Sequence, residues 1–288
     1  MKKKPIGIVA DEAADLPEEL RNKYQIENVL YKVSFPEEEF EGIRLKGNFY
    51  QKIRKAVKPP FTSFPQARDF QRVYQKALKN FDRILVIVLS STLSKAYAHG
   101  ALIAKQKMDL ENQKRIEVFD SFLAATAQGL LVMKAQELID QGKEMKEILI
   151  YLSKFKKKIK LFGFLEDVKW LKAGGRISSP LAKVLEAFQN KGIRPAIGLR
   201  NGKVVMEGIR FFAKDRVRTI LKEIKKLKKR GEIKIAIDHA DVIDETQKLK
   251  QGIEALGQEV LFISQLSPLL GAHTGPGTLI VSYYFEKE

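Results

Sequence analysis

The chain of 288 residues contains no cysteine, which excludes disulfide bonds and thiolate chemistry and fits a cytoplasmic protein. No apolar run approaches the roughly 18 residues that a membrane-spanning helix needs. The N-terminal MKKK leads directly into a strand-like run at residues 6–10, which is too short for the core of a signal peptide. We therefore expect a cytoplasmic globular protein.

Several signatures of catalysis and cofactor binding are also missing. No G-x-G-x-x-G follows a strand-like run, which argues against a dinucleotide site. The nucleophile elbow G-x-S-x-G is absent, and Lys95 directly follows Ser94, so these side chains do not face each other on a helix. A lone histidine such as His239, between Asp238 and Asp241, is more often structural than a metal ligand. We expect no catalytic residue, no metal and no cofactor.

Positive charge is in excess, with 52 Lys and Arg against 35 Asp and Glu and a net charge of +17. The densest basic runs are residues 154–160 and 221–234. In the second run, apolar residues recur at helical spacing, which is typical of an amphipathic helix with a solvated basic face. Aromatic residues that would stack bases do not interleave, so we do not expect nucleic-acid binding. An acidic partner or a transient contact with anionic lipid headgroups suits this charge better.

Three strand-like runs in the first half end in small polar or acidic residues: Asp11, Ser90 with Ser91, and Asp120 with Ser121. A helix-like stretch follows each run, at residues 13–24, 93–108 and 122–141. Apolar strands that alternate with amphipathic helices predict a parallel α/β sheet. Ligands bind outside the carboxyl ends of such strands, so we expect the three polar clusters to meet at one edge.

We predict two domains that join near residue 160. The N-terminal α/β domain would span residues 1–160 and include a hairpin-like excursion at residues 28–65, where the prolines of KPPFTSFP forbid a helix. The C-terminal domain, residues 161–288, shows an α+β pattern. Within it, Asn201-Gly202 is expected to form the turn of a β-hairpin.

Two stretches stand out as possible binding elements. The first is SSTLS, residues 90–94, whose hydroxyls either cap a helix or join its free N–H groups in binding an anion such as a carboxylate. The second is GAHTGPGTL, residues 271–279, whose glycines permit close backbone approach. We expect a turn, not a helix, around His273.

Four motifs in series, TSFP at 62–65, SSTLS, LKAGGRIS at 171–178 and GAHTGPGTL, resemble those of the DegV family of bacterial fatty-acid-binding proteins. The resemblance runs the whole length of the chain. It implies a two-domain DegV-like α/β fold, with an N-terminal three-layer α/β/α domain around a parallel sheet and a C-terminal two-layer α+β domain with a mixed sheet. It also implies a long-chain fatty acid buried between the two domains.

The resemblance further implies how the ligand is held and used. The hydroxyls of Thr62 and Ser94 would bind the carboxylate, with Ser91 and Ser63 nearby. In the best understood members a separate fatty acid kinase phosphorylates the presented carboxylate, which makes the binding protein itself non-catalytic. Arg210 and His273 would lie near the exit and contact that kinase, and His273 could instead contact the headgroup.

The chain departs from the family pattern at three positions. Glu12 follows Asp11 where the family has serine, and Lys95 and Ala96 replace Gly-Thr after Ser94. Glu12 would add a carboxylate that repels an anionic headgroup, whereas Lys95 would add a cation near a helix N-terminus.

An enzyme is the competing hypothesis. A small hydrolase or phosphatase would use Asp11, Asp120 and His273 at the shared edge of the sheet. No nucleophile–base pair at an interpretable spacing supports this alternative.

Overall fold

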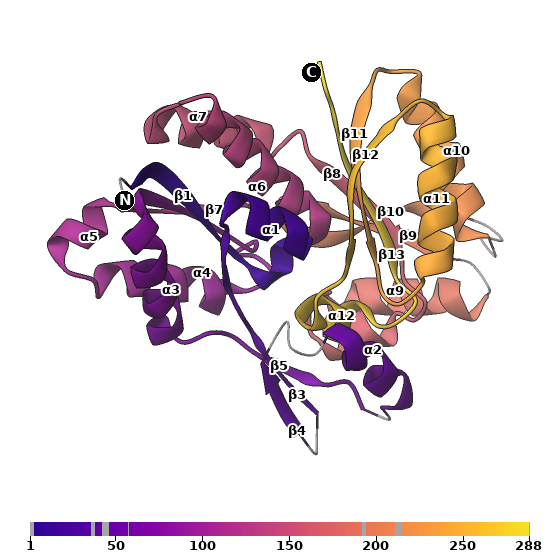
Figure 1. The fold of residues 1–288 in the computed structure, drawn as a ribbon. Coiled ribbons are helices and arrows are strands. Elements are labelled where there is room, and N and C mark those ends of the chain that lie inside the picture. The colour runs from indigo at the N-terminus through magenta and orange to yellow at the C-terminus, as the bar shows by residue number, and fades with distance from the viewer. Residues whose placement is uncertain are drawn as a thin grey trace.

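The computed structural model describes residues 3–35, 38–41, 46–56, 58–191, 194–210 and 215–287. Figure 1 shows two sheets side by side with helices on their outer faces and between them. We name these the first sheet, in the N-terminal half, and the second sheet, in the C-terminal half.

The first sheet has four parallel strands in the order β2-β1-β6-β7. Their bounds are β1 Lys4–Asp11, β2 Glu27–Val29, β6 Phe81–Val88 and β7 Ile116–Asp120. The central strands β1 and β6 are buried over most of their length, as expected when helices cover both faces of a parallel sheet. The predicted parallel arrangement is confirmed, and the carboxyl ends of β1, β6 and β7 meet at one edge.

Helices cover both faces of the first sheet and give the predicted three layers (Figure 1). One face carries α3 Ala67–Asn80, α4 Lys95–Gln106 and α5 Leu110–Lys114. The other carries the 3₁₀ helix η1 Glu12–Ala14, α1 Glu18–Tyr24, α6 Ala125–Asp140 and, packed on α6, α7 Met145–Phe155. Helices α4 and α6 begin two to three residues later than the sequence predicts, because turns follow both strand ends.

The excursion after β2 forms a small antiparallel sheet in the order β4-β3-β5, joined to a helix. Its elements are β3 Lys32–Phe35, β4 Glu38–Glu41, α2 Lys46–Lys55 and β5 Phe61–Ser63. Figure 1 shows this sheet projecting below the body of the molecule, with α2 beside α12 (Pro268–Thr274). The Tyr50 hydroxyl donates to the Leu266 carbonyl at 2.9 Å, which attaches α2 to the C-terminal half.

The second sheet has six strands in the order β10-β9-β8-β13-β11-β12. The strands are β8 Lys160–Phe164, β9 Arg194–Arg200, β10 Lys203–Arg210, β11 Ile233–His239, β12 Glu259–Gln265 and β13 Leu279–Phe285. The pairing of β11 with β12 is parallel and the other pairings are antiparallel, so the sheet is mixed as predicted. The hairpin at Asn201-Gly202 is confirmed, with both residues at positive φ as a type I′ turn requires.

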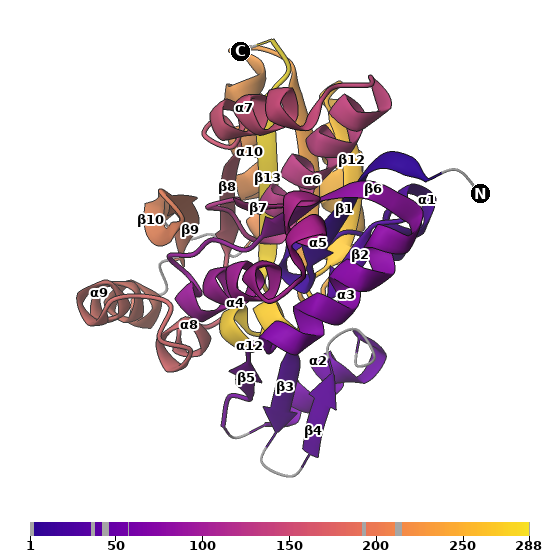
Figure 2. The same ribbon diagram turned by 90° about the vertical axis from the view of Figure 1, so that its left-hand side faces the viewer.

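Helices α10 Arg216–Lys228 and α11 Ile243–Ala255 cover the outer face of the second sheet (Figure 1). Helices α8 Lys169–Ala173 and α9 Ser179–Asn190 lie at one end of it, beside α12, in the view of Figure 2. In the part of the chain that the structure describes, no helix is both long and apolar enough to cross a membrane.

Helix α6 packs between the two sheets. Eleven of its sixteen residues are buried, and a Cβ added at Gly129 would lie 2.7 Å from the Ala14 carbonyl and 3.0 Å from the Phe262 ring. One hydrophobic core therefore extends from Ile8 of β1 through α6 to Ile280 of β13. All strands of the second sheet begin at or after Lys160, and the division into domains 1–160 and 161–288 stays a prediction.

Candidate functional site

A cavity lies between the carboxyl edge of the first sheet, the second sheet and α12. It encloses about 830 Å³ of space, a figure that includes space open to solvent. Its wall is mostly aliphatic and comes from both halves of the chain: Leu89, Leu93, Leu161, Ile197, Leu269 and Ile280. Phe64, which is about half exposed, lies at its open side.

Polar side chains gather in the wall of this otherwise apolar cavity. Thr62 on β5, Ser94 at the start of α4 and His273 on α12 all line it. The Thr62 hydroxyl and His273 Nε2 share a hydrogen bond of 3.1 Å. Ser94 occupies the N-cap position of α4, but its side chain makes no capping hydrogen bond. The structure thus brings three of the predicted residues together and leaves the Ser94 hydroxyl without the capping role that the sequence allowed.

His273 lies in the last turn of α12, so the prediction of a turn at this residue is wrong. Pro268 occupies the first turn, where proline favours a helix, and the Ser267 side chain accepts the Leu270 N–H. Gly275, at φ +79, then ends the helix. Burial, and to a lesser degree the charge of Arg176, lowers the pKa of His273 to about 4, so its imidazole is neutral at pH 7.

Arg176, in the loop between α8 and α9, also lines the cavity. Its Nη1 donates to the Gly174 carbonyl at 2.9 Å, and among the described residues no carboxylate forms an ion pair with it. Burial lowers the pKa of this guanidinium, which nevertheless remains a cation at pH 7. Arg176 belongs to the LKAGGRIS motif, and its place in the cavity wall was not predicted from the sequence.

The rest of the SSTLS turn forms hydrogen bonds within the protein, through the hydroxyls of Ser90 and Thr92 and the backbone of Ser91. Ser90 Oγ donates to the Gly202 carbonyl at 3.0 Å and lies 2.8 Å from Thr92 Oγ1, so the β9–β10 turn rests on this loop. The Ser91 N–H donates to Asp120 Oδ1 at 3.2 Å. Ser91 is not among the residues that line the cavity, and neither is Ser63, which is exposed on β5.

Asp11 and Asp120 bind backbone groups and do not line the cavity with His273. Asp11 accepts the N–H groups of Leu89 and Ala13, and desolvation by burial raises the pKa of its carboxyl to about 7 against these donors. Asp120 Oδ1 accepts the N–H of Phe122 at 3.0 Å as well as that of Ser91. The geometry therefore gives no support to a hydrolase that uses these two carboxylates with His273.

Two of the departures from the family pattern, Glu12 and Lys95, lie off the cavity wall. Glu12 is buried, and its Oε2 accepts the Tyr31 N–H at 2.9 Å. It does not line the cavity, so the expected repulsion of a headgroup is not a direct contact. Lys95 is exposed at the start of α4, and the side chain of Ala96 lies outside the described part of the structure.

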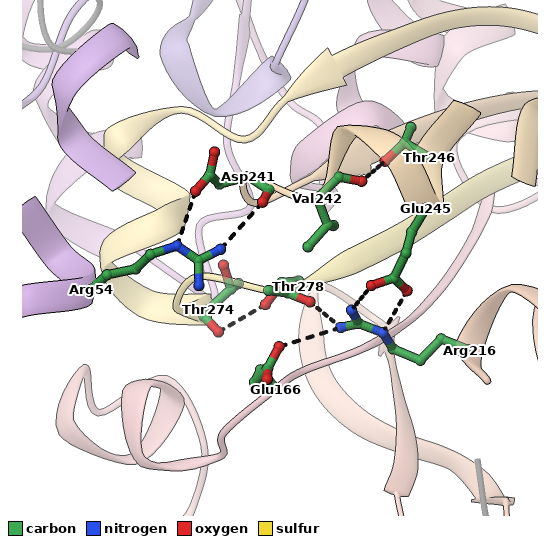
Figure 3. Close-up of polar contacts among 10 residues, drawn as sticks. Arg54, Glu166, Arg216, Asp241, Val242, Glu245, Thr246, Thr274 and Thr278 are labelled. Atoms are coloured by element: carbon green, nitrogen blue, oxygen red, sulfur yellow. Dashed lines mark hydrogen bonds and ion pairs between the residues drawn. The ribbon is translucent and has the colours of Figure 1, made fainter. Parts of the chain in front are cut away.

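A buried arginine fixes the loop that follows His273 (Figure 3). Arg216, at the start of α10, is 6% exposed and pairs through two nitrogens with Glu245 of α11, at 2.6 and 3.2 Å. Its Nη1 also donates to the Gly277 carbonyl. The Thr278 hydroxyl donates to the Thr274 carbonyl at 2.9 Å, so the loop is tied to the end of α12. Sequence reasoning did not find this network, because its members lie far apart in the chain.

Arg210 is the last residue of β10, where its backbone pairs with Arg194. The predicted role of this arginine depends on its side chain, which lies outside the described part of the structure.

These features define a two-sheet α/β protein with a mostly apolar, partly open cavity that has a few polar side chains in its wall. A family profile described as "Uncharacterised protein, DegV family" matches residues 5–286. The chain belongs to the DegV family.

Known relatives cover nearly the whole chain. Protein DegV of Bacillus subtilis is 29% identical over 293 residues, which is 98% of this chain and 99% of the relative. A protein of Thermotoga maritima named "Fatty acid-binding protein" is 28% identical over 95% of this chain and 96% of its own. The solved structure of a DegV family protein from Thermus thermophilus, described with fatty acid binding, superposes with a TM-score of 0.85 at 26% identity, covering 98% and 99% of the two chains.

Proposed function

We propose that this protein binds a long-chain fatty acid in the cavity between its two sheets, with the carboxylate at the polar end near Thr62 and Ser94. The observation that carries the proposal is a mostly aliphatic cavity that is also lined by the polar side chains of Thr62, Ser94 and His273. An amphipathic ligand with one polar end matches that wall. The names of the Thermotoga and Thermus relatives support the same ligand class.

The energetics favour a long chain. Each buried methylene contributes about 0.8 kcal/mol, so the acyl chain supplies most of the affinity. The headgroup then needs only enough donors to replace its water: the hydroxyls of Thr62 and Ser94, and the guanidinium of Arg176. Thr62 and Ser94 were the expected donors, and Arg176 adds a cation to them.

Neutral His273 has a supporting role in this proposal. When its Nε2–H donates to the Thr62 oxygen, the Thr62 hydroxyl proton is left for the ligand carboxylate. Ser91 and Ser63 do not line the cavity and have no contact with the ligand in this proposal.

We further propose that the protein is a non-catalytic carrier that presents the carboxylate to a separate fatty acid kinase. The family resemblance suggests this step, with Arg210 and His273 on the side that the kinase contacts. The cavity is partly open to solvent, which a bound headgroup needs if another protein is to reach it.

The test is extraction of the purified protein and mass spectrometry of the extract. We expect a long-chain fatty acid in stoichiometric amount. Delipidated protein should bind hexadecanoate and should bind octanoate far more weakly, because eight fewer methylenes are buried. Absence of lipid in the extract together with no binding of hexadecanoate would overturn the proposal.

A further inference from the structure

Tyr31 places a buried hydroxyl in the cavity wall. Its side chain lines the cavity and is 3% exposed, and its hydroxyl has no hydrogen-bond partner among the described residues. Most buried polar groups in proteins have a partner, so an unpartnered one beside a cavity points to a ligand atom that completes it.

The ring of Tyr31 is held rigidly. Its backbone N–H donates to Glu12 Oε2 at 2.9 Å, and its ring stacks on Tyr97 with centroids 4.8 Å apart and planes 9° apart. Tyr97 in turn packs edge-on against Phe70 at 4.9 Å. The hydroxyl is therefore fixed before any ligand arrives, which lowers the entropy cost of a hydrogen bond to it.

Tyr31 lies at the polar end of the cavity. It immediately precedes β3, whose Val33 pairs with Thr62 of β5. Tyr31 and Thr62 both line the cavity, and the charge of Arg176 acts on Tyr31 as well as on His273, which is hydrogen-bonded to Thr62. Desolvation by burial raises the pKa of Tyr31 well above its usual value, so the phenol keeps its proton and serves as a donor.

We propose that the Tyr31 hydroxyl donates a hydrogen bond to the carboxylate of the bound ligand and makes the site select a free acid over its ester. This inference rests on the proposed fatty-acid binding. With Thr62, Ser94 and Arg176, Tyr31 would complete four donor groups around a carboxylate, which has about four acceptor positions. Buried Glu12 would then position Tyr31, because its carboxylate accepts the Tyr31 backbone N–H.

The proposal makes opposite predictions for the free and the bound protein. Without ligand the hydroxyl is buried and unsatisfied, so Tyr31→Phe should leave the thermal midpoint of the delipidated protein equal or higher. With ligand the variant lacks a charge-assisted hydrogen bond, so hexadecanoate should bind about 10-fold more weakly. If Tyr31 had a purely structural role, Tyr31→Phe would lower both the thermal midpoint and the affinity for hexadecanoate.

The experiment measures binding of hexadecanoate and of methyl hexadecanoate to delipidated wild type, Tyr31→Phe and Tyr97→Phe. The Tyr97 ring stacks on Tyr31 but does not line the cavity, so Tyr97→Phe is the matched control and should bind both ligands as wild type does. In Tyr31→Phe we expect the preference for acid over ester to shrink about 10-fold, with the ester affected little.

Unchanged binding of hexadecanoate by Tyr31→Phe would overturn the inference and leave the proposed function intact. Equal losses for acid and ester would also overturn it, because Tyr31 would then contact the chain and not the headgroup. If wild type binds neither ligand, the proposed function fails first, and the role of Tyr31 fails with it.

Discussion

Hydroxyl groups of the same chemistry have different roles within five positions of this chain. Ser90 and Thr92 form one hydrogen-bonded pair, and Ser90 also donates to the β9–β10 turn. Ser94, two residues after Thr92, lines the cavity and makes no capping bond. Sequence spacing places all three in one turn, but only the packing of the second sheet decides which hydroxyl is left for a ligand.

Removal of the two cavity hydroxyls should weaken binding without unfolding the protein. We expect the Thr62→Ala/Ser94→Ala double variant to lose a few kcal/mol of binding free energy at most, at about 0.5–1.5 kcal/mol for each neutral hydrogen bond and 1.5–3 for a charged partner. Titration calorimetry with hexadecanoate measures the loss. Ser63→Ala, which removes an exposed hydroxyl beside Thr62, is the comparison and should bind normally. Wild-type affinity in the double variant would place the headgroup elsewhere.

His273 should make the protein sensitive to acid. The folded pKa of about 4 lies below the ordinary value of 6.5, so the unfolded chain takes up the proton first as the pH falls. The contribution of His273 is complete above pH 6.5 and is lost as the pH falls toward 4. At about 1.4 kcal/mol per pH unit, the loss reaches up to about 3 kcal/mol.

The measurement is the free energy of unfolding of wild type and His273→Gln across this pH range. Glutamine keeps a polar group near Thr62 but does not titrate, so wild type should lose up to about 3 kcal/mol of unfolding free energy relative to the variant as the pH falls toward 4. Parallel curves for the two proteins would show that His273 does not carry this acid sensitivity.

Among the elements, the β9–β10 hairpin packs against the N-terminal half of the chain at Gly202. Gly202 has φ +74, and a Cβ added there would lie 2.3 Å from Ser90 Oγ and 2.5 Å from Thr92 Oγ1. Glycine is therefore required at position 202 for two reasons: its positive φ, and its close contact with the SSTLS turn. The sequence predicted the first need from the Asn-Gly pair, but the second comes from residues 110 or more positions away.

Gly202→Ala should therefore destabilise more than the backbone angle alone explains. Gly142, at φ +75 with nothing within 4 Å of an added Cβ, is the matched control. We expect Gly142→Ala to cost about 1 kcal/mol of unfolding free energy and Gly202→Ala about 1–3 kcal/mol more. Urea unfolding measures both. Equal costs would mean that the hairpin turn does not rest tightly on Ser90.

Local sequence signals predicted the elements that depend on near neighbours. The parallel strands ending at Asp11 and Asp120 and the Asn201-Gly202 turn all carry such signals. Helix α12 was missed because its glycines suggested a turn, whereas its position depends on packing against α2 and α8. A bond such as Tyr50 to Leu266, across 216 positions, leaves no pattern in a single sequence.

At the scale of the whole molecule, the excess of 17 positive charges favours encounters with acidic surfaces. Such long-range attraction speeds association and weakens with salt, and it acts on a kinase or an anionic membrane alike. The net charge therefore affects the rate at which a partner associates, whereas specific side-chain contacts determine which partner forms a functional complex. Arg210 is our candidate for that contact.

Arg210→Ala should separate lipid binding from presentation. An arginine offers a planar fork to carboxylates of a partner. We expect the variant to bind hexadecanoate as wild type does and to support less acyl-phosphate formation when a cognate kinase and ATP are supplied. Both assays use the same preparation. Equal losses in the two would place Arg210 in the cavity, and no loss in either would remove it from the mechanism.

Helix α6 limits how the two halves of the molecule can move relative to each other. Both sheets pack on this one helix. A hinge motion that separated the two halves would therefore expose the core that contains Ile8 and Ile280. If the proposed fatty acid binds in the cavity, we expect it to exchange through local displacements of segments at the cavity rim. The same sharing means that heat should melt the chain in a single transition, since neither half keeps a complete interior when the other is lost.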